Sequence, residues 1–345
     1  MALEVEIIKS ASRLEAFGPE WFEVWKEQPE TTPFQSPEWL LPWWKYFGSG
    51  PLVSMAFRDR GALVGFAPLF IFFDSASKRR KVVLIGTGNT DYLDILASEP
   101  YRETVVKKLL AELSGPELRD EWDLCDFQQL RASSPLLHGQ ADPATSRASM
   151  TFSLSTQEIC PVMVLKPGAP VNTDLPSGKL KELAKAQRRL ESRGTVRFAL
   201  ADWSNFDEIH AALIRHHDAR WYRRGVGDAE FSNKARAFLK EAVERLLSRG
   251  FVRLHALYFD EIIIAGVLCF VHRDKAYYYM TGFDAEFSRF GVGNVILSRS
   301  IMSCIDEGVR EIDFLRGREP YKYQWSPEER LNRRLEIRKV PSRYH

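Results

Sequence analysis

One stretch of the sequence, Asp284–Gly308, constrains the fold most strongly. It begins with a loop that carries Gly291 and Gly293 and continues as an amphipathic helix. A strand-like run, Ala276–Gly282, precedes the stretch, and another, Glu311–Arg316, follows it. The order strand, glycine-bearing loop, helix, strand places backbone amides at a helix N-terminus, where an anionic group can bind. We therefore interpret this loop as a pyrophosphate-binding site.

The length of the chain predicts more than one domain. At 345 residues the chain is longer than a single hydrophobic core usually accommodates. One order of elements occurs twice: strand, two helices, three antiparallel strands, helix, strand, short helix, strand. A linker rich in Pro, Gly and Asn, Pro167–Pro176, separates the two passes. We expect an N-terminal domain over residues 1–170 and a C-terminal domain over residues 171–345.

Three predictions within these passes concern single elements. Ala62–Phe73 reads as one strand of a hairpin. Glu319–Glu329 reads as helical, and Arg334–Val340 reads as the last strand.

The two halves differ where a ligand would bind. The second half has Gly291-Val-Gly293 before its helix, whereas the first has Ser98-Glu-Pro-Tyr-Arg-Glu103, with no glycine and two acids. Glycine lets backbone amides approach a phosphate because no Cβ intervenes, and carboxylates would repel it. We expect a phosphorylated ligand in the second half and a degenerate first domain.

The metal-binding residue types give no recognisable site. The cysteines stand in apolar contexts without paired spacing, and we interpret them as reduced core thiols; they are Cys125, Cys160, Cys269 and Cys304. His216 and His217 are adjacent, so on a helix they point in different directions. The sequence therefore predicts no metal site.

Charge and hydropathy constrain the compartment and the partners only weakly. The formal net charge of +2 argues neither for nor against nucleic acid. The N-terminus lacks a basic region followed by a long apolar one, so we expect no signal peptide. The longest apolar stretch, Ala62–Phe73, is too short to span a bilayer. We expect a soluble cytoplasmic protein without membrane insertion.

Three motifs carry a resemblance to a known family. They are Pro33-Phe-Gln-Ser-Pro-Glu-Trp39, Tyr278-Tyr-Tyr-Met-Thr-Gly-Phe-Asp284 and Asp313-Phe-Leu-Arg-Gly-Arg-Glu-Pro-Tyr-Lys-Tyr-Gln-Trp325. With the element order, they resemble the double-GNAT acyltransferases of BioF2-like or CelD-like type, which are associated with cellulose biosynthesis and related to FemAB and FemX. The resemblance covers about Glu4 to Val340. It implies a mixed α/β (α+β) fold of two tandem GNAT domains.

The resemblance also implies an acyl-CoA donor, acetyl-CoA first, with its pyrophosphate on the loop. GNAT loops usually read Gln/Arg-x-x-Gly-x-Gly/Ala; here Ser288 stands at the first position and Arg289 one place later. In GNAT folds the fourth strand separates from the fifth, and its free amides bind the pantetheine and the oxyanion. The implied donor-binding residues are Tyr279, Met280, Thr281, Arg289, Gly291, Val292, Gly293 and Asn294.

Acyl transfer to an amine needs a deprotonated amine, a stabilised oxyanion and a proton for the leaving thiolate. The resemblance implies a tyrosine as the thiolate's acid, and Tyr321 is preferred to Tyr323. Asp313 and Glu319 are candidates to accept the amine proton or to fix the ammonium group. Ion pairing of these acids within the same segment is the structural alternative.

The acceptor is expected between the two domains, where Trp, Arg and Asp side chains would suit a sugar. For the aromatic residues, packing in the core or at the domain interface is the alternative. For Arg316 and Lys322, the alternative is ion pairing with Asp313 and Glu319. The expected substrate-binding residues are Gln35, Trp39, Asp91, Tyr92 and Asp94 in the first domain and Arg220, Trp221, Arg316 and Lys322 in the second.

The sequence thus predicts an N-acyltransferase that moves an acyl group, foremost acetyl, from acyl-CoA to an amine of a sugar or another polar acceptor. A role in cell-surface polysaccharide metabolism rests on the family's name. The basic helix Lys179–Arg193 keeps a FemX-like aminoacyl-tRNA-dependent transferase as an alternative, although a solvated basic face explains it equally. A non-catalytic binding module is the third possibility, against which the retained Gly291/Gly293 loop argues.

Overall fold

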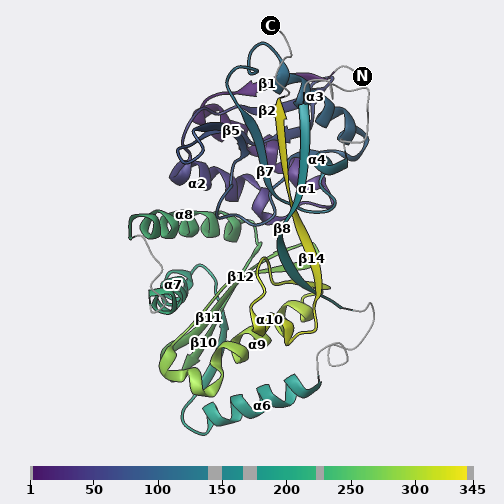
Figure 1. The fold of residues 1–345 in the computed structure, drawn as a ribbon. Helices are drawn as coiled ribbons and strands as arrows, with labels where there is room; N and C mark the ends of the chain where they lie inside the picture. The colour runs from purple at the N-terminus through teal and green to yellow at the C-terminus, as the bar shows by residue number, and fades with distance from the viewer. Residues whose placement is uncertain (1–2, 139–149, 166–176, 223–228, 340–345) are drawn as a thin grey trace. The chain divides into compact units, whose positions relative to one another are not determined.

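The structure is a computed structural model that describes residues 3–138, 150–165, 177–222 and 229–339 (Figure 1). The chain forms two compact units. Unit 1 comprises Met1–Glu158 and Leu331–His345, and unit 2 comprises Ile159–Arg330. Both are mixed α/β structures, as the sequence predicted. The domain boundary predicted at residue 170 lies outside the described residues and stays a prediction.

Unit 1 combines helices with two groups of strands. One sheet has the strand order β1-β2-β3-β6, and β4, β5, β7 and β14 are neighbours in another. The elements are β1 (Glu4–Ile8), α1 (Ala11–Glu27), α2 (Pro37–Phe47), β2 (Ser54–Asp59), β3 (Ala62–Ala67), β4 (Leu69–Asp74), β5 (Arg79–Leu84), β6 (Leu96–Ala97), α3 (Arg102–Ser114), β7 (Leu124–Leu130) and α4 (Pro135–His138).

The prediction of a single strand over Ala62–Phe73 is wrong. The stretch forms two strands that join different sheets: β3 pairs with β2 and β6, and β4 pairs with β5. Pro68 stands between them. Proline has no N–H to donate to a ladder, so a strand interior at this position is disfavoured.

Unit 2 is built around an antiparallel run of strands in the order β9-β10-β11-β12, with β13 parallel to β12. Its elements are α6 (Ser177–Glu191), β9 (Val196–Leu200), α7 (Phe206–Tyr222), α8 (Ala229–Ser248), β10 (Val252–Phe259), β11 (Ile262–His272), β12 (Lys275–Phe283), η4 (Ala285–Phe290), α9 (Val292–Asp306), β13 (Glu311–Asp313) and α10 (Pro320–Tyr323).

Two strands exchange places between the halves of the chain. The residues Val162–Val164 of β8 (Met150–Val164) pair with β13. The residues Arg333–Arg338 of β14 (Glu328–Lys339) pair with β7. The last strand of the first half, β8, thus pairs with β13 of the second half. The last strand of the second half, β14, pairs with β7 of the first half.

The prediction of a helix over Glu319–Glu329 is wrong for most of that range. The helix α10 covers only Pro320–Tyr323, and β14 already begins at Glu328, six residues before the predicted Arg334. The reason lies in the strand exchange: the partners of β14 are distant in sequence and leave no local pattern to read.

β12 separates from β13 after three residue pairs. Lys275–Tyr277 pair with Glu311–Asp313. Beyond that point the chain follows β8, because the amide of Phe314 donates to the carbonyl of Pro161 (3.0 Å) and that of Gly317 to the carbonyl of Ile159 (2.9 Å). Within the described residues, the second half of β12 thus has a free edge on this side.

A β-bulge at Tyr279 lies on that free part of β12. Tyr278 pairs with Cys269 and Met280 with Leu268, so Tyr279 is the extra residue between them. A one-residue insertion reverses the face of the sheet onto which all later side chains point.

The helices α7 and α9 cover opposite faces of this sheet (Figure 1), and the bulge decides which of them each residue meets. Gly282 faces α7, where a Cβ would lie 2.8 Å from the carbonyl oxygen of Leu213. Phe283 faces α9, where a Cβ on Gly293 would lie 2.9 Å from the Phe283 ring. Both glycines therefore permit a close approach of strand and helix.

Candidate functional site

A cavity of about 410 Å³ opens at the free edge of β12. This volume falls within the usual range of small-molecule sites. Its wall comprises residues 279–281 and Phe283 of β12, the loop and first turns of α9, His217 of α7, and Glu319 and Tyr321 near α10. All of these residues belong to unit 2.

The loop that leads into α9 is shaped for an anion. Asp284 caps the short helix η4 by accepting a hydrogen bond from the amide of Glu286 (2.9 Å). Gly291 follows with φ 70°, a left-handed conformation that glycine favours. No side chain in the described structure caps the first turn of α9. Its leading amides and the helix dipole therefore favour an anionic group at this end of the cavity.

Most of the predicted donor-binding residues meet in this cavity. Tyr279, Met280 and Thr281 line it from the strand, and Gly291, Gly293 and Asn294 line it from the loop and helix. Val292 is buried in the core of unit 2 and can contribute only its backbone.

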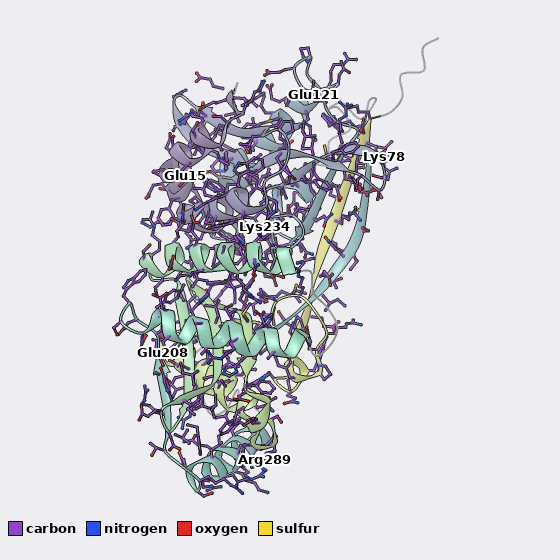
Figure 2. All side chains as sticks on the ribbon, turned by 90° about the vertical axis from the view of Figure 1, so that its left-hand side faces the viewer. Glu15, Lys78, Glu121, Glu208, Lys234 and Arg289 are labelled. Atoms are coloured by element: carbon purple, nitrogen blue, oxygen red, sulfur yellow. The ribbon has the colours of Figure 1, made fainter. Side chains whose placement is uncertain are left out.

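Arg289 lies elsewhere. Its guanidinium carbon is 4.9 Å from the centre of the Phe290 ring, and Figure 2 shows it beside α6. Ser288, at the position where GNAT loops carry Gln or Arg, lines the cavity instead.

The two candidate tyrosines take different positions. Tyr321 lines the cavity. Tyr323 is exposed, and its hydroxyl donates a hydrogen bond to Glu329 Oε1 (2.6 Å). Glu319 also lines the cavity, and its carboxylate lies 2.9 Å from Lys322 Nζ, so the ion pair expected as a structural alternative is present.

Asp313 and Lys322 organise the segment that follows β13. Asp313 is buried, and its Oδ1 accepts a hydrogen bond from the amide of Leu315 (2.8 Å). The buried ammonium group of Lys322 donates to the carbonyls of Leu315 (3.2 Å), Arg316 (2.7 Å) and Gly317 (3.2 Å). Among the described residues, the cavity wall includes neither Asp313 nor Arg316 nor Lys322.

His217 is a site residue that the sequence reading missed. His216 is turned inward, with Nε2 2.8 Å from the carbonyl of Ile263, whereas His217 lines the cavity. The Nδ1 atom of His217 lies 3.5 Å from Asp218 Oδ1, and Asp218 pairs with Arg236 at 2.6 Å. The two adjacent histidines were the available signal, but they were weighed only as metal ligands.

The residues predicted to hold the acceptor in the first domain are all buried in unit 1; they are Gln35, Trp39, Asp91, Tyr92 and Asp94. The Trp39 indole donates to Thr90 Oγ1 (3.1 Å), and the Gln35 side chain accepts from the amide of Thr32 (2.9 Å). These contacts are those of interior packing. The side chains of Arg220 and Trp221 lie outside the described residues, and an acceptor site between the domains stays a prediction.

Asp94 lies at a small cavity of about 20 Å³ in unit 1, together with Arg102 and Arg131. One water fills a space of this size. The carboxylate accepts hydrogen bonds from Ser134 Oγ and from the amide of Ile95, both at 2.8 Å. Burial raises the pKa of Asp94 to about 7 despite these bonds, because desolvation disfavours the charged form.

Comparisons with known proteins identify the fold around the cavity. Residues 177–323 match the family model of an acetyltransferase (GNAT) domain. The chain carries a GNAT domain. The match includes β12, the glycine loop, α9 and Tyr321, so the whole cavity wall lies within the matched segment.

Solved structures resemble the chain over almost its whole length. FemX has a TM-score of 0.64 at 10% identity, covering 96% of both chains. The C-terminal domain of a putative lysylphosphatidylglycerol synthetase from Agrobacterium fabrum has a TM-score of 0.59 at 13% identity, covering 95% of this chain and 92% of that one. A conserved protein of unknown function from Bacteroides thetaiotaomicron has a TM-score of 0.61 at 10% identity, covering 97% and 100%.

At these identities the likeness shows the fold alone, and the fold is the predicted one: two GNAT units in tandem. No curated protein sequence matches this chain. Among its described residues, no helix is both long and apolar enough to cross a bilayer.

The raised pKa of Asp94 predicts a dependence of stability on pH. The ordinary pKa of the carboxyl is 3.8, so between about pH 4 and pH 7 the native state keeps a proton that the unfolded state has lost. Stability from this group therefore falls as the pH rises through that window. Asp94→Asn keeps an oxygen acceptor and removes the charge. Its melting temperature should exceed that of the wild type at pH 8, by a margin that narrows toward pH 4.

The exposed carboxyl of Asp120 provides the control, since Asp120→Asn should leave the melting temperature unchanged across the same range. A difference between Asp94→Asn and wild type that stays constant from pH 4 to pH 8 would contradict the assignment.

Proposed function

We propose that the protein is an acyl-CoA-dependent N-acyltransferase with one donor site, in unit 2. The observation that supports this most is a single cavity joining the uncapped first turn of α9 to the free edge of β12. The first feature suits a pyrophosphate. The second suits an extended chain that carries amides, as pantetheine does, because a free strand edge offers backbone donors and acceptors.

The bulge supplies the backbone amide that we assign to stabilise the oxyanion. At Tyr279 the regular ladder with β11 is interrupted, and bulges of this kind redirect backbone groups next to active sites. An amide of the Tyr279–Thr281 segment would then donate to the thioester carbonyl as its oxygen becomes negative. Such a fixed donor is worth about 3 kcal/mol in comparable oxyanion sites.

We assign the chemistry to two of the polar side chains that line the cavity, His217 and Tyr321. The amine nitrogen attacks the thioester carbonyl carbon, and His217 accepts the proton that the nitrogen loses. Asp218 orients the imidazole through its Nδ1 side. When the carbon–sulfur bond breaks, the Tyr321 hydroxyl protonates the thiolate and recovers its proton from solvent. The products are an amide and free CoA.

The identity of the acyl group and of the acceptor is part of the proposal. We favour acetyl as the acyl group and an amine of a sugar or another polar molecule as the acceptor, in the cytoplasm and in polysaccharide metabolism. This assignment rests on the family resemblance of the motifs. The site of the chemistry rests on the cavity.

An aminoacyl-tRNA donor is a second candidate, favoured by a group of three arginines. The guanidinium carbons of Arg189, Arg193 and Arg289 lie 5.8, 5.3 and 4.9 Å from the centre of the Phe290 ring. None of the three pairs with an acid among the described residues. Positive charge beside a phosphate loop suits a polynucleotide backbone. It equally suits the further phosphate that CoA carries on its ribose.

Acyl-CoA should stabilise the protein through the cavity. Adding acetyl-CoA at about 100 times its dissociation constant should add about 2.7 kcal/mol and raise the melting temperature by several degrees. Gly293→Glu should abolish the shift, because its Cβ would meet Phe283 and its carboxylate would repel the pyrophosphate. Gly178→Glu, where a Cβ meets nothing, is the matched control and should keep the shift.

The same experiment separates the two donors. No shift with acetyl-CoA or longer acyl-CoAs, together with retention of tRNA on a filter that Arg189→Glu and Arg193→Glu weaken, would replace the first proposal by the second. Absence of both responses would leave a non-catalytic fold.

Loss of the Tyr321 hydroxyl should slow the chemical step. We expect Tyr321→Phe to lower kcat by about 100-fold, as loss of a general acid does, with little change in the dissociation constant of acetyl-CoA. Tyr323→Phe is the control, because that hydroxyl is engaged by Glu329 outside the cavity wall. Free thiol released from acetyl-CoA measures the rate. Equal rates for Tyr321→Phe and wild type would remove Tyr321 from this role.

Loss of the His217 imidazole should change the pH profile as well as the rate. His217→Gln should lower kcat/KM by about 100-fold near neutral pH and remove the acidic limb of the profile. His138→Gln, an exposed histidine of unit 1, should leave the profile unchanged. A variant whose profile keeps the wild-type limb would exclude His217 as the base.

A further inference from the structure

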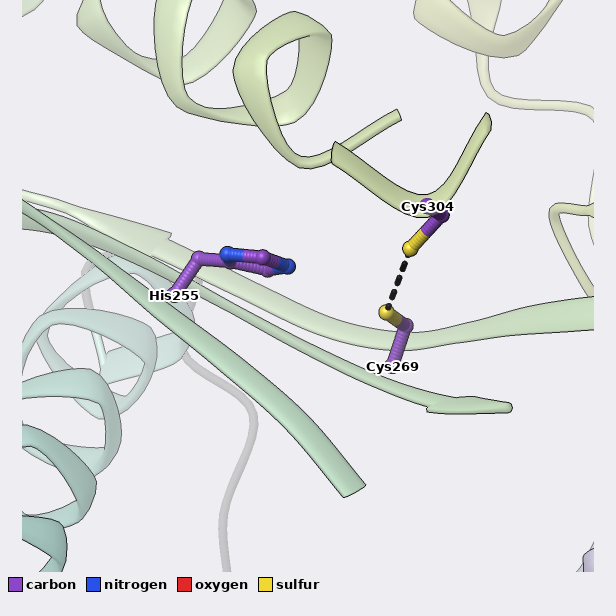
Figure 3. A group of neighbouring side chains, drawn as sticks. All are labelled: His255, Cys269 and Cys304. Atoms are coloured by element: carbon purple, nitrogen blue, oxygen red, sulfur yellow. Dashed lines mark hydrogen bonds between the residues drawn. The ribbon is translucent and has the colours of Figure 1, made fainter. Parts of the chain in front are cut away.

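Three buried side chains that could bind a metal converge in the core of unit 2. His255 lies on β10, Cys269 on β11 and Cys304 on α9, and each is fully buried. One potential ligand atom from each lies within 4.8 Å of the others. The two sulfur atoms are 3.9 Å apart. Figure 3 shows the imidazole from one strand and the two thiols, from the neighbouring strand and the helix above, pointing toward one another.

The sheet register explains why the two strands present their ligands together. His255 pairs with Val267, and Cys269 stands two residues further along the same strand, opposite Arg253. Residues two apart share one face of a sheet, so the histidine and the cysteine are diagonal neighbours. That face is the one covered by α9, which brings the Cys304 thiol onto them.

The unsatisfied imidazole of His255 is the observation that points to a bound ion. Within the described structure, neither of its ring nitrogens makes a hydrogen bond. Among the described residues, its ring stacks on that of Phe198, with ring centres 5.0 Å apart. A buried polar group without a partner costs about 1–3 kcal/mol, so native proteins rarely leave one in place. A cation bound by the imidazole would supply the missing partner.

We propose that His255, Cys269 and Cys304 bind one thiophilic metal ion with a filled d shell, Cu(I) or Zn(II). Imidazole and thiolate are the donors such ions prefer. Two thiolates at about 2.3 Å from one tetrahedral zinc ion stand about 3.8 Å apart, close to the observed sulfur separation. Binding releases the two thiol protons, and two thiolates then balance the charge of Zn(II) in this apolar surrounding.

The number of ligands distinguishes the two ions. Structural zinc takes four ligands, and here three are evident. One nearby polar group is the Tyr278 hydroxyl, 3.7 Å from Cys304 Sγ and 3.2 Å from Ser300 Oγ. Zn(II) would require this oxygen or another ligand in fourth place, whereas Cu(I) is satisfied by three.

The ion would tie the helix of the donor site to the sheet. Cys304 stands near the end of α9, the helix whose first turn carries Gly293. A metal bond from its last turns to β10 and β11 would fix the helix against the strands that it covers. None of the three ligands lines the cavity, so the site is a structural one and does not depend on the proposed function.

The experiment measures metal in the whole protein. Protein unfolded with a chelator under anaerobic, reducing conditions is refolded with Zn²⁺, with Cu(I), or with neither, then desalted and analysed for metal. We expect about one ion per chain with the preferred metal. Cys269→Ser, Cys304→Ser and His255→Ala should each lower the ratio at least five-fold, whereas Cys125→Ser, a buried thiol of unit 1, should keep it.

Wild-type protein refolded with Co²⁺ provides a readout that does not depend on the folding of any variant. A thiolate-to-cobalt charge-transfer band in the near ultraviolet supports the site, and its absence, together with no bound zinc or copper, overturns it. A mass lower by two hydrogens with two thiols lost identifies a Cys269–Cys304 disulfide instead and also overturns it.

Discussion

The divergence of β12 from β13 is the feature on which the candidate site depends. Two strands that stay paired to their ends leave no free edge, and a sheet covered by helices then has no room for a ligand between its strands. Here β13 is held by β8 on its other side, and the chain after Asp313 continues along β8 rather than β12. Pairing with the exchanged strand β8 therefore directs the chain away from β12, and the cavity lies at the edge of β12 that this leaves unpaired with β13.

The bulge at Tyr279 determines where glycine is needed around the cavity. Because Tyr279 is an extra residue, Phe283 turns toward α9 and Gly282 toward α7. Helix α9 can then approach the strand only if the residue under the Phe283 ring lacks a Cβ, which is the case at Gly293. Gly291 supplies the left-handed turn that starts the helix. The inserted residue thereby determines the requirement for glycine at two positions, Gly282 and Gly293.

The sequence allowed the fold and the glycine loop before α9 to be predicted, because both rest on local signals, whereas donor binding at that loop stays a prediction. The order of elements and the pair Gly291/Gly293 are readable without a structure. The reason given for Gly293 was incomplete: the sequence suggested access for a phosphate, whereas the structure adds the packing of Phe283. The prediction for Ala62–Phe73 is wrong because Pro68 separates two strands that join different sheets. The prediction for β14 is wrong because the partners of that strand are distant in sequence.

Which of the candidate side chains face the cavity could not be predicted from the sequence, because that depends on how the chain folds around them. Asp313 looked catalytic from its place at a strand end, but its carboxylate is used by the amide of Leu315. His217 looked like half of a histidine pair, and only the fold shows that it faces the cavity while its neighbour turns inward. The spacing of Cys269 and Cys304 suggested isolated thiols for the same reason. A strand register and a helix crossing bring them together, and neither is encoded in the interval between two residues.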